Sequence, residues 1–79
     1  MNVRFHPHCR ERMAMRGIPD ADVMHVLEPF HSSFPARPLP GRAFRSRIYV
    51  GTVAGDDLQV SVEEGTNPPY VRTVAWSLR

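Results

Sequence analysis

Three side chains with chemistry suited to phosphate are spaced by four residues near the start of the chain: His8, Arg12 and Arg16. In an α-helix with about 3.6 residues per turn, a step of four advances only about 40° around the axis, so the three share one side. A guanidinium donates two parallel hydrogen bonds to a phosphate, and an imidazole exchanges a proton readily near neutral pH. The row therefore predicts a helix surface that can bind a phosphodiester and move a proton.

An ordinary structural role is the other interpretation of this row. Arginine is a good helix former, and such rows are commonly solvated faces or sets of ion pairs, here with Asp20, Asp22 or Glu28. Cys9 and Met13 lie on the next strip of the helix and are expected to face the core, with Cys9 as a small buried hydrophobe rather than a nucleophile. Gly17 is expected to end the helix as its C-terminal cap.

A second set of polar side chains, Arg45, Arg47 and Tyr49, shares one face of a predicted strand, because alternate residues of a strand point the same way. If that face meets the helix row, with Thr73 or Arg72 nearby, the two sets form one cleft. RNA cleavage without a metal ion needs a base for the 2′-OH proton, an acid for the leaving oxygen and cations around the phosphorus. Tyr49 could stack on a base or cover the sheet, and the alternative is the exposed face of a hairpin.

Histidines and the single cysteine raise the question of a metal site. His6, His8 and Cys9 are clustered, with His25 and His31 further along the chain. The spacing of the first two, with one proline between them, differs from two-ligand motifs such as His-Glu-x-x-His and Cys-x-x-Cys. We therefore predict neither a metal ion nor a cofactor.

Composition limits the class of protein. With 79 residues, the chain is expected to form a single domain over residues 1–79. No apolar run approaches the roughly 20 residues of a membrane span, and the start lacks a signal-peptide core, so no membrane partner is expected. One cysteine excludes an intrachain disulfide and suits a reducing cytoplasm. Residues 1–47 carry eight Arg against four acidic residues, a net +4 that favours a polyanionic partner.

Periodicity predicts the elements that position these residues. Residues 3–5 indicate an edge strand, residues 8–16 a helix, and a second helix begins within residues 18–22 and ends at Pro29. The apolar face of that second helix would comprise Val23, Val26, Leu27 and Phe30. Residues 29–41 are proline-rich and predict a connector, part of which (residues 32–36) can run extended along a sheet edge.

Hydrophobic residues alternate with polar ones from residue 43 onward. This pattern predicts strands over residues 43–53, 58–63 and 70–78, with turns at residues 55–57 and 65–69. The result is an α+β domain in the order β-α-α-β-β-β, with both helices on one face of a three- to four-stranded antiparallel sheet. Trp76 is expected in the core and His25 on the surface.

The segment His8-Cys9-x-x-Arg12-Met13-x-x-Arg16-Gly17-Ile18-Pro19-x-x-Asp22-Val23 resembles the H-A-x-x-R-M-x-x-R-G-I-x-x-x-D/E-V opening of a family of small bacterial domains of unknown function. Those domains look like relatives of the BrnT and RelE toxins. The resemblance covers the first third of the chain, and residues 73–76 are similar to a closing Thr-Val-x-Trp. It implies a RelE-like fold, ribonuclease activity, an antitoxin partner and a site at His8, Arg12 and Arg16.

The departures from this pattern bear on the chemistry. Cys9 stands where Ala is usual, and Pro19 where Ser is common. Because the chain has no lysine, arginines would have to replace the lysines that RelE-type catalysis uses.

Two functions follow as hypotheses. The first is a cytoplasmic, toxin-like RNA-binding domain and metal-independent endoribonuclease. His8 would transfer the proton, Arg12 and Arg16 would clamp the phosphate, and the substrate would also contact Arg45, Arg47, Tyr49 and Thr73. The second is a non-catalytic interaction module, in which the arginine row docks an acidic protein or closes the helix packing. Exposed strand edges would also suit a homodimer or capping by an antitoxin.

Overall fold

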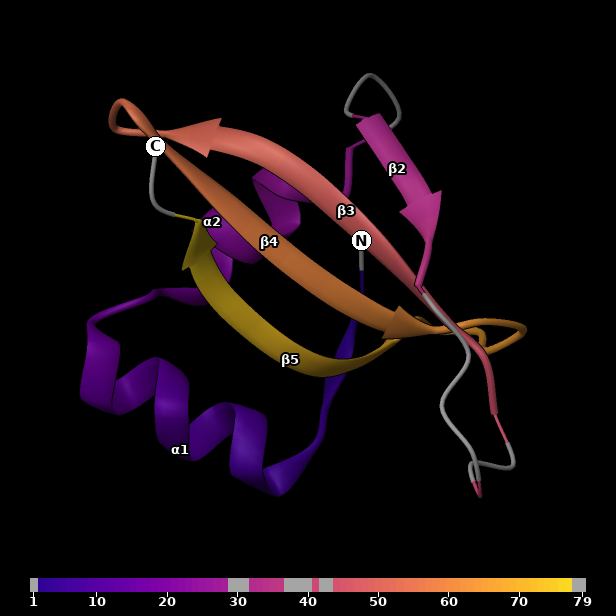
Figure 1. Cartoon of the computed structure of the whole chain (residues 1–79). Coiled ribbons are helices and arrows are strands. Elements are labelled where there is room, and N and C mark those ends of the chain that lie inside the picture. The colour runs from indigo at the N-terminus through magenta and orange to yellow at the C-terminus, as the bar shows by residue number, and fades with distance from the viewer. Residues whose placement is uncertain (1, 29–31, 37–40, 42–43, 78–79) are drawn as a thin grey trace.

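The computed structural model describes residues 2–28, 32–36, 41 and 44–77. These residues form two helices, α1 (Pro7–Arg16) and α2 (Asp20–Val26), and five strands, β1 (Arg4–Phe5), β2 (Ser32–Pro35), β3 (Ser46–Val53), β4 (Asp56–Glu63) and β5 (Tyr70–Ser77). The strands make one sheet in the order β1-β5-β4-β3-β2 (Figure 1). The α+β class is confirmed.

The sheet differs from the prediction in strand number and direction. It has five strands and is mixed, whereas we predicted three or four antiparallel ones. β1 runs parallel to β5, and all other neighbours are antiparallel. β2 comes from the proline-rich connector and pairs with β3 at the far edge, where a proline that cannot donate a ladder hydrogen bond is tolerated. A strand of two residues such as β1 carries no pattern that reveals its direction.

α1 has well-defined ends. The side chain of His6 caps its start by accepting a hydrogen bond on Nδ1 from the backbone N–H of His8, 3.2 Å away, and Pro7 takes the first helical position. Gly17 ends it with φ of 66°, a left-handed conformation that glycine adopts without a steric penalty. These ends hold the predicted row on ten residues of regular helix.

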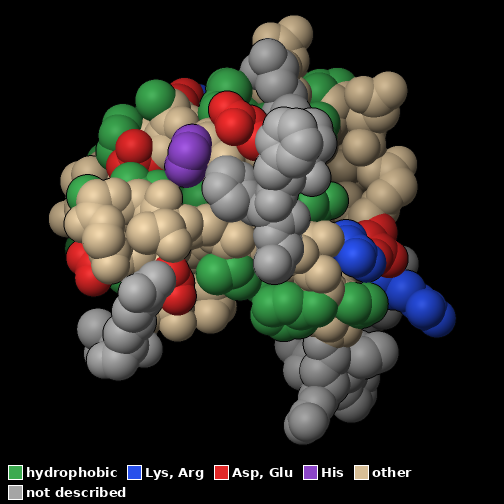
Figure 2. All heavy atoms as spheres, turned by 90° about the horizontal axis from the view of Figure 1, so that it is seen from above, with side chains coloured by type: hydrophobic (Ala, Val, Ile, Leu, Met, Phe, Trp, Pro, Cys, Tyr) green, Lys and Arg blue, Asp and Glu red, His purple; other side chains and the backbone are tan. Residues whose placement is uncertain are grey.

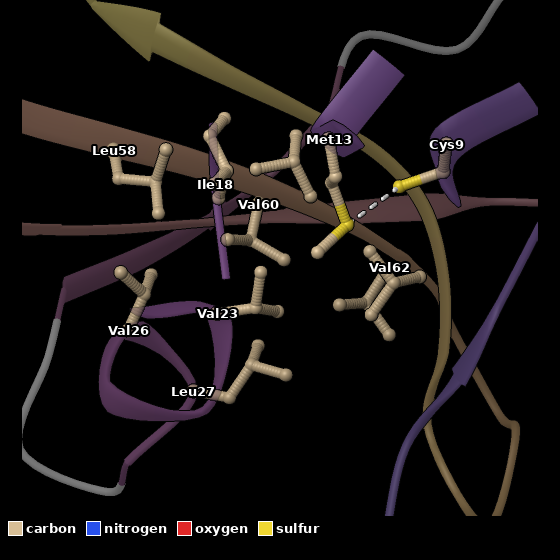
Figure 3. Packing of buried hydrophobic residues seen from close by; sticks show 11 residues of the cluster. Cys9, Met13, Ile18, Val23, Val26, Leu27, Leu58, Val60 and Val62 are labelled. Atoms are coloured by element: carbon tan, nitrogen blue, oxygen red, sulfur yellow. Dashed lines mark hydrogen bonds between the residues drawn. The ribbon is translucent and has the colours of Figure 1, made fainter. Parts of the chain in front are cut away.

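One hydrophobic core lies between the helices and the inner face of the sheet (Figure 3). As predicted, Cys9 and Met13 are buried in it, with their sulfur atoms 3.8 Å apart. α2 supplies Val23 and Val26, and the sheet supplies Leu58, Val60, Val62, Val71 and Val74. α1 packs against β5, and α2 packs against β3 and β4, so both helices cover one face as expected.

Trp76 is not among the buried core residues. Trp76 shares the inner face with Leu58, its partner in the β4–β5 pairing, yet 36% of its surface is exposed. Its side chain, near the end of the last strand, is too exposed to belong to the buried core, so the prediction of a core tryptophan is wrong. Phe30, expected on the apolar face of α2, lies outside the described residues. The predicted end of this helix at Pro29 is wrong, because α2 already ends at Val26 with Leu27 as its C-terminal cap.

The β3–β4 turn lies one residue earlier than predicted. Ala54 and Gly55, with φ of 51° and 90°, form the two-residue connection. Positive φ at both central positions is the geometry that joins adjacent antiparallel strands most directly. Asp56 and Asp57 therefore begin β4 instead of belonging to the turn.

The other face of the sheet, which we call the open face, packs against neither described helix. Figure 1 views the sheet from this side, with α2 behind β4 and α1 beyond β5. Paired residues on neighbouring strands share a face. The register therefore places one row of side chains across the open face, in the order Phe34, Ile48, Ser61 and Thr73.

Candidate functional site

A pocket of about 550 Å³ lies between α1 and the open face of β5 and β4, and we call it the α1–β5 pocket. It is lined by His6, His8, Cys9, Arg12, Arg16, Ser61, Arg72, Thr73, Val74 and Ala75. Of the predicted site residues, the pocket brings together His8, Arg12, Arg16 and Thr73, and Arg72, considered as a possible neighbour, lines it as well. α1 and the residue before it supply two imidazoles and two guanidiniums, and the strands supply the Arg72 guanidinium with small or hydroxyl side chains.

His8 and Arg12 are the residues of the row most accessible to a ligand. The Nδ1 atom of His8 lies 3.8 Å from a carboxylate oxygen of Glu11, too far for a hydrogen bond, and the His8 side chain is 78% exposed. Arg12 is exposed and makes no hydrogen bond or ion pair with another described residue. Its guanidinium can therefore meet an anion without first giving up an internal partner.

Arg16 is partly committed to the fold. Its guanidinium donates a hydrogen bond of 2.9 Å to the backbone carbonyl of Val74, on the edge of β5. This contact joins the end of α1 to a strand edge that β1 leaves unpaired beyond Val71. A planar guanidinium has five N–H donors, so Arg16 keeps others for a ligand.

Arg72 enters the pocket because of an irregularity in the sheet. Ser61 pairs with Thr73 and Val62 with Val71, so Arg72 is the extra residue of a β-bulge. A bulge re-aims side chains, and such features recur at functional sites. The Arg72 guanidinium lies 3.7 Å from a carboxylate oxygen of Glu63 and 4.1 Å from the centre of the Phe44 ring. Sequence periodicity alone cannot reveal this bulge, because strict alternation continues through it.

His6 is a pocket residue whose role the sequence did not reveal. Its ring stacks on that of His8, with the centroids 5.5 Å apart and the planes 17° from parallel. Because its Nδ1 accepts the capping hydrogen bond, the proton of the neutral ring resides on Nε2. The lone pair of His6 is therefore used by the helix, which leaves His8 as the imidazole available for proton transfer. Histidine is an uncommon N-cap, so sequence preferences do not predict this role.

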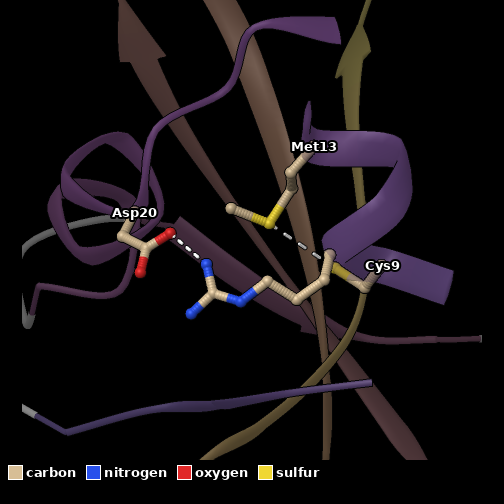
Figure 4. Close-up of polar contacts among 4 residues, drawn as sticks. Cys9, Met13 and Asp20 are labelled. Atoms are coloured by element: carbon tan, nitrogen blue, oxygen red, sulfur yellow. Dashed lines mark hydrogen bonds and ion pairs between the residues drawn. The ribbon is translucent and has the colours of Figure 1, made fainter. Parts of the chain in front are cut away.

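The sequence allowed an ion pair between an arginine of the row and Asp20, but a different arginine of α1 makes this ion pair. Arg10, on another side of α1, pairs with Asp20 at the start of α2, as Figure 4 shows. Its guanidinium also lies 4.2 Å from the centre of the Phe5 ring. The hydrogen bond to Asp20 raises the pKa of Arg10. Arg10 thus links α1 to α2 and β1, and Asp20 is not a partner of the row.

Arg47 and Tyr49 lie on the opposite face of the sheet from the open-face residues of the pocket. Tyr49 pairs with the buried Val60 and packs against the core, whereas Thr73 lies on the open face. Arg47 donates a hydrogen bond of 2.9 Å from Nε to the Ser33 hydroxyl, and it lies 3.9 Å from Glu64. Both residues line a second pocket, of about 320 Å³. The single composite cleft that we considered is therefore not formed.

Arg45 is also separate from the α1–β5 pocket. It is exposed, just before β3, and it lines neither of the two pockets described. Its backbone carbonyl accepts a hydrogen bond of 2.8 Å from the N–H of Glu64. Arg45 is thus a natural comparison residue for the arginines of the pocket.

Charge is unevenly spread over the surface. Figure 2 looks down on the molecule of Figure 1 and shows acidic side chains scattered over this face, with arginine at one edge. α1 lies at the bottom of Figure 1, on the far side from this view. The α1–β5 pocket therefore lies away from the face that Figure 2 shows.

Cys9 lies at the pocket wall, but only 2% of its surface is exposed. Burial raises the pKa of its thiol, and nearby Arg10 lowers it by a smaller amount. We expect iodoacetamide to alkylate Cys9 in the folded protein more than about tenfold more slowly than in the urea-unfolded chain, because the thiolate is the reactive form. A Met15→Cys, Cys9→Ala variant, with its thiol on an exposed position, should react rapidly in both states. Equal rates for Cys9 would mean that the pocket admits reagents to it.

Among the residues that the structure describes, no three His, Cys, Asp or Glu side chains come together as a metal-binding group. Within the same part of the chain, neither helix has the length and apolar character needed to cross a membrane. Comparison of the chain with protein-family models, with curated proteins and with solved structures gives no match.

Proposed function

We propose that this chain is a toxin-like RNA-binding domain that holds a phosphodiester in the α1–β5 pocket and cleaves it without a metal ion. The observation that carries the proposal is the meeting, in one open pocket, of His8 and Arg12 from α1 with Arg72 and Thr73 from β5. Guanidiniums suit phosphate because their planar fork gives two parallel hydrogen bonds. The resemblance of the helix motif to BrnT and RelE toxins adds the ribonuclease class.

Each side chain has a distinct part in the proposed reaction. Arg12 and Arg72 bind the non-bridging phosphate oxygens, and Arg16 adds a donor while it holds α1 against β5. These cations stabilise the charge that develops at phosphorus. His8 accepts the proton of the 2′-OH, because the lone pair of the other imidazole in the pocket, His6, is engaged by the helix cap.

The proposed cleavage is an attack by the ribose 2′ oxygen on the neighbouring phosphate. The 2′ oxygen loses its proton to His8 and attacks the adjacent phosphorus, and the bond from phosphorus to the 5′ oxygen breaks. The leaving 5′ oxygen takes a proton from solvent, which reaches the pocket because His8 and Arg12 are exposed. The products are one fragment with a 2′,3′-cyclic phosphate and one with a 5′-OH.

A non-catalytic interaction module is the second candidate, and one observation favours it. Arg16 uses its guanidinium to hold α1 on β5, so part of the row serves packing. In this case an acidic protein segment would occupy the pocket instead of RNA, and a partner chain of antitoxin type would bind there.

Binding of a short, mixed-sequence RNA in EDTA tests the proposal. Arg12→Ala is expected to weaken RNA binding and to lower the slope of log affinity against log salt by about 0.7, the value for one lost phosphate contact on a single strand. Arg45→Ala is the matched control, since it removes an exposed arginine outside the pocket. If both variants lose the same affinity, RNA responds only to overall charge and the pocket is not its site.

A further inference from the structure

We propose that the open face of the sheet binds the bases of a single-stranded RNA whose backbone lies in the α1–β5 pocket. This inference rests on the proposed function, because it assigns the part of the RNA that extends beyond the phosphate site. It names the substrate as an unpaired strand of several nucleotides, laid from β5 toward β2.

The row of open-face residues connects the pocket to the far edge of the sheet. Thr73 and Ser61 line the pocket, Ser61 pairs with Ile48, and Ile48 pairs with Phe34 on β2. A parallel row leads from Ala75, also in the pocket, through Gln59 to Val50. The pocket floor and the open face are therefore one continuous surface.

The open face carries apolar groups that the core does not use. Phe34 is 46% exposed, and Ile48 and Val50 are only partly buried although they point away from the helices. An exposed aromatic ring offers a base a stacking partner irrespective of its identity. The cross-strand partners of Val50 and Ile48 on β4 are Gln59 and Ser61, whose side chains can hydrogen-bond to base edges.

An aromatic and arginine cluster lies where the backbone would enter. Tyr70 begins β5 with its ring centre 5.6 Å from the guanidinium of Arg72 and 5.1 Å from that of Arg4, and it lies 6.2 Å from the His6 ring. The Phe44 ring also lies close to Arg72, with its centre 4.1 Å from the guanidinium. Basic side chains interleaved with aromatic rings are typical of surfaces that bind single strands.

The size of the surface favours a strand over a lone phosphate. Three strand spacings separate β5 from β2, which is about 14 Å. One phosphate occupies only the pocket end of this surface. A duplex would present paired and stacked bases that cannot lie flat on the open face.

The test compares Phe34→Ser with Met15→Ser in binding to a single-stranded RNA and to an abasic strand of equal length. Both substitutions remove an exposed apolar side chain. Met15, which is 80% exposed, is the control because it lies on α1 and not on the open face. We expect Phe34→Ser to weaken RNA binding by about fivefold or more, the effect of losing one stacked base. Abasic binding should stay at the parent value for both variants, and Met15→Ser should bind RNA as the parent does.

A further variant separates stacking from damage to the fold. Phe34→Trp keeps an aromatic ring and is expected to retain the parent affinity, whereas a variant that merely harmed the sheet would not be rescued this way. Arg12→Ala should weaken both ligands, because the pocket holds the backbone. Duplex RNA of the same sequence is expected to bind more weakly than the single strand.

Three results would overturn the inference. If Phe34→Ser binds RNA like the parent while Arg12→Ala does not, the pocket binds RNA and the open face plays no part. If Phe34→Ser instead turns a dimer into a monomer in sedimentation without changing RNA affinity, this face is covered by a second copy. If the parent itself binds no RNA, the proposed function fails together with the inference.

Discussion

Replacing His8 with alanine is expected to lower the rate of RNA cleavage in EDTA by about 10²–10⁴-fold, the contribution typical of a positioned general base. RNA affinity should change little, because the arginines and not the imidazole hold the phosphate. The measurement is a single-turnover cleavage assay on a mixed-sequence RNA, with the ends of the fragments identified. The parent should leave 2′,3′-cyclic phosphates, since the proposed nucleophile is the adjacent 2′-OH.

Two histidine variants serve as controls for this experiment. His25→Ala changes an exposed histidine on α2 that does not line the α1–β5 pocket, and it should cleave like the parent. His6→Asn keeps a side-chain acceptor for the helix cap and removes the second imidazole, so it should retain most of the activity. Cleavage by His8→Ala at the parent rate would exclude His8 as the base. Binding without any cleavage would leave RNA binding as the function.

Leu58→Ala is expected to have the largest effect on stability, a loss of about 2–5 kcal/mol in the free energy of unfolding. Leu58 is fully buried on β4, facing the helices, and its removal leaves a cavity among the side chains that join the two layers. The total free energy of unfolding of such proteins is only about 5–15 kcal/mol, so the midpoint of thermal unfolding should fall by more than about 10 °C.

Urea unfolding monitored by circular dichroism measures this change. Met15→Ala is the control, because Met15 is the most exposed of the large apolar side chains described and should change stability by less than about 0.5 kcal/mol. A loss below about 1 kcal/mol for Leu58→Ala would contradict the core described here. It would mean that the sheet and helices do not depend on this contact.

The local pattern of the sequence was sufficient for most of the elements. The four-residue spacing of His8, Arg12 and Arg16 placed them on one side of α1, with Cys9 and Met13 turned to the core. Gly17 ended that helix as predicted, because only a residue without a Cβ adopts its backbone conformation at no cost. Alternation likewise placed β3, β4 and β5. These features depend on neighbours within a few residues, so the sequence alone determined them.

Which surfaces meet was decided by the tertiary structure. The alternation of residues placed Arg47 and Tyr49 on one face of β3. An alternating pattern separates the two faces of a strand, but it does not show which face the helices cover. The pairing with β4 placed Arg47 and Tyr49 on the side of the helices. The α1–β5 pocket around His8 and Arg12 formed because of the bulge at Arg72 and the packing of α1 on the β5 edge. Likewise, the parallel direction of β1 and the 36% exposure of Trp76 result from long-range packing. Such contacts join residues far apart in the chain, and no local pattern encodes them.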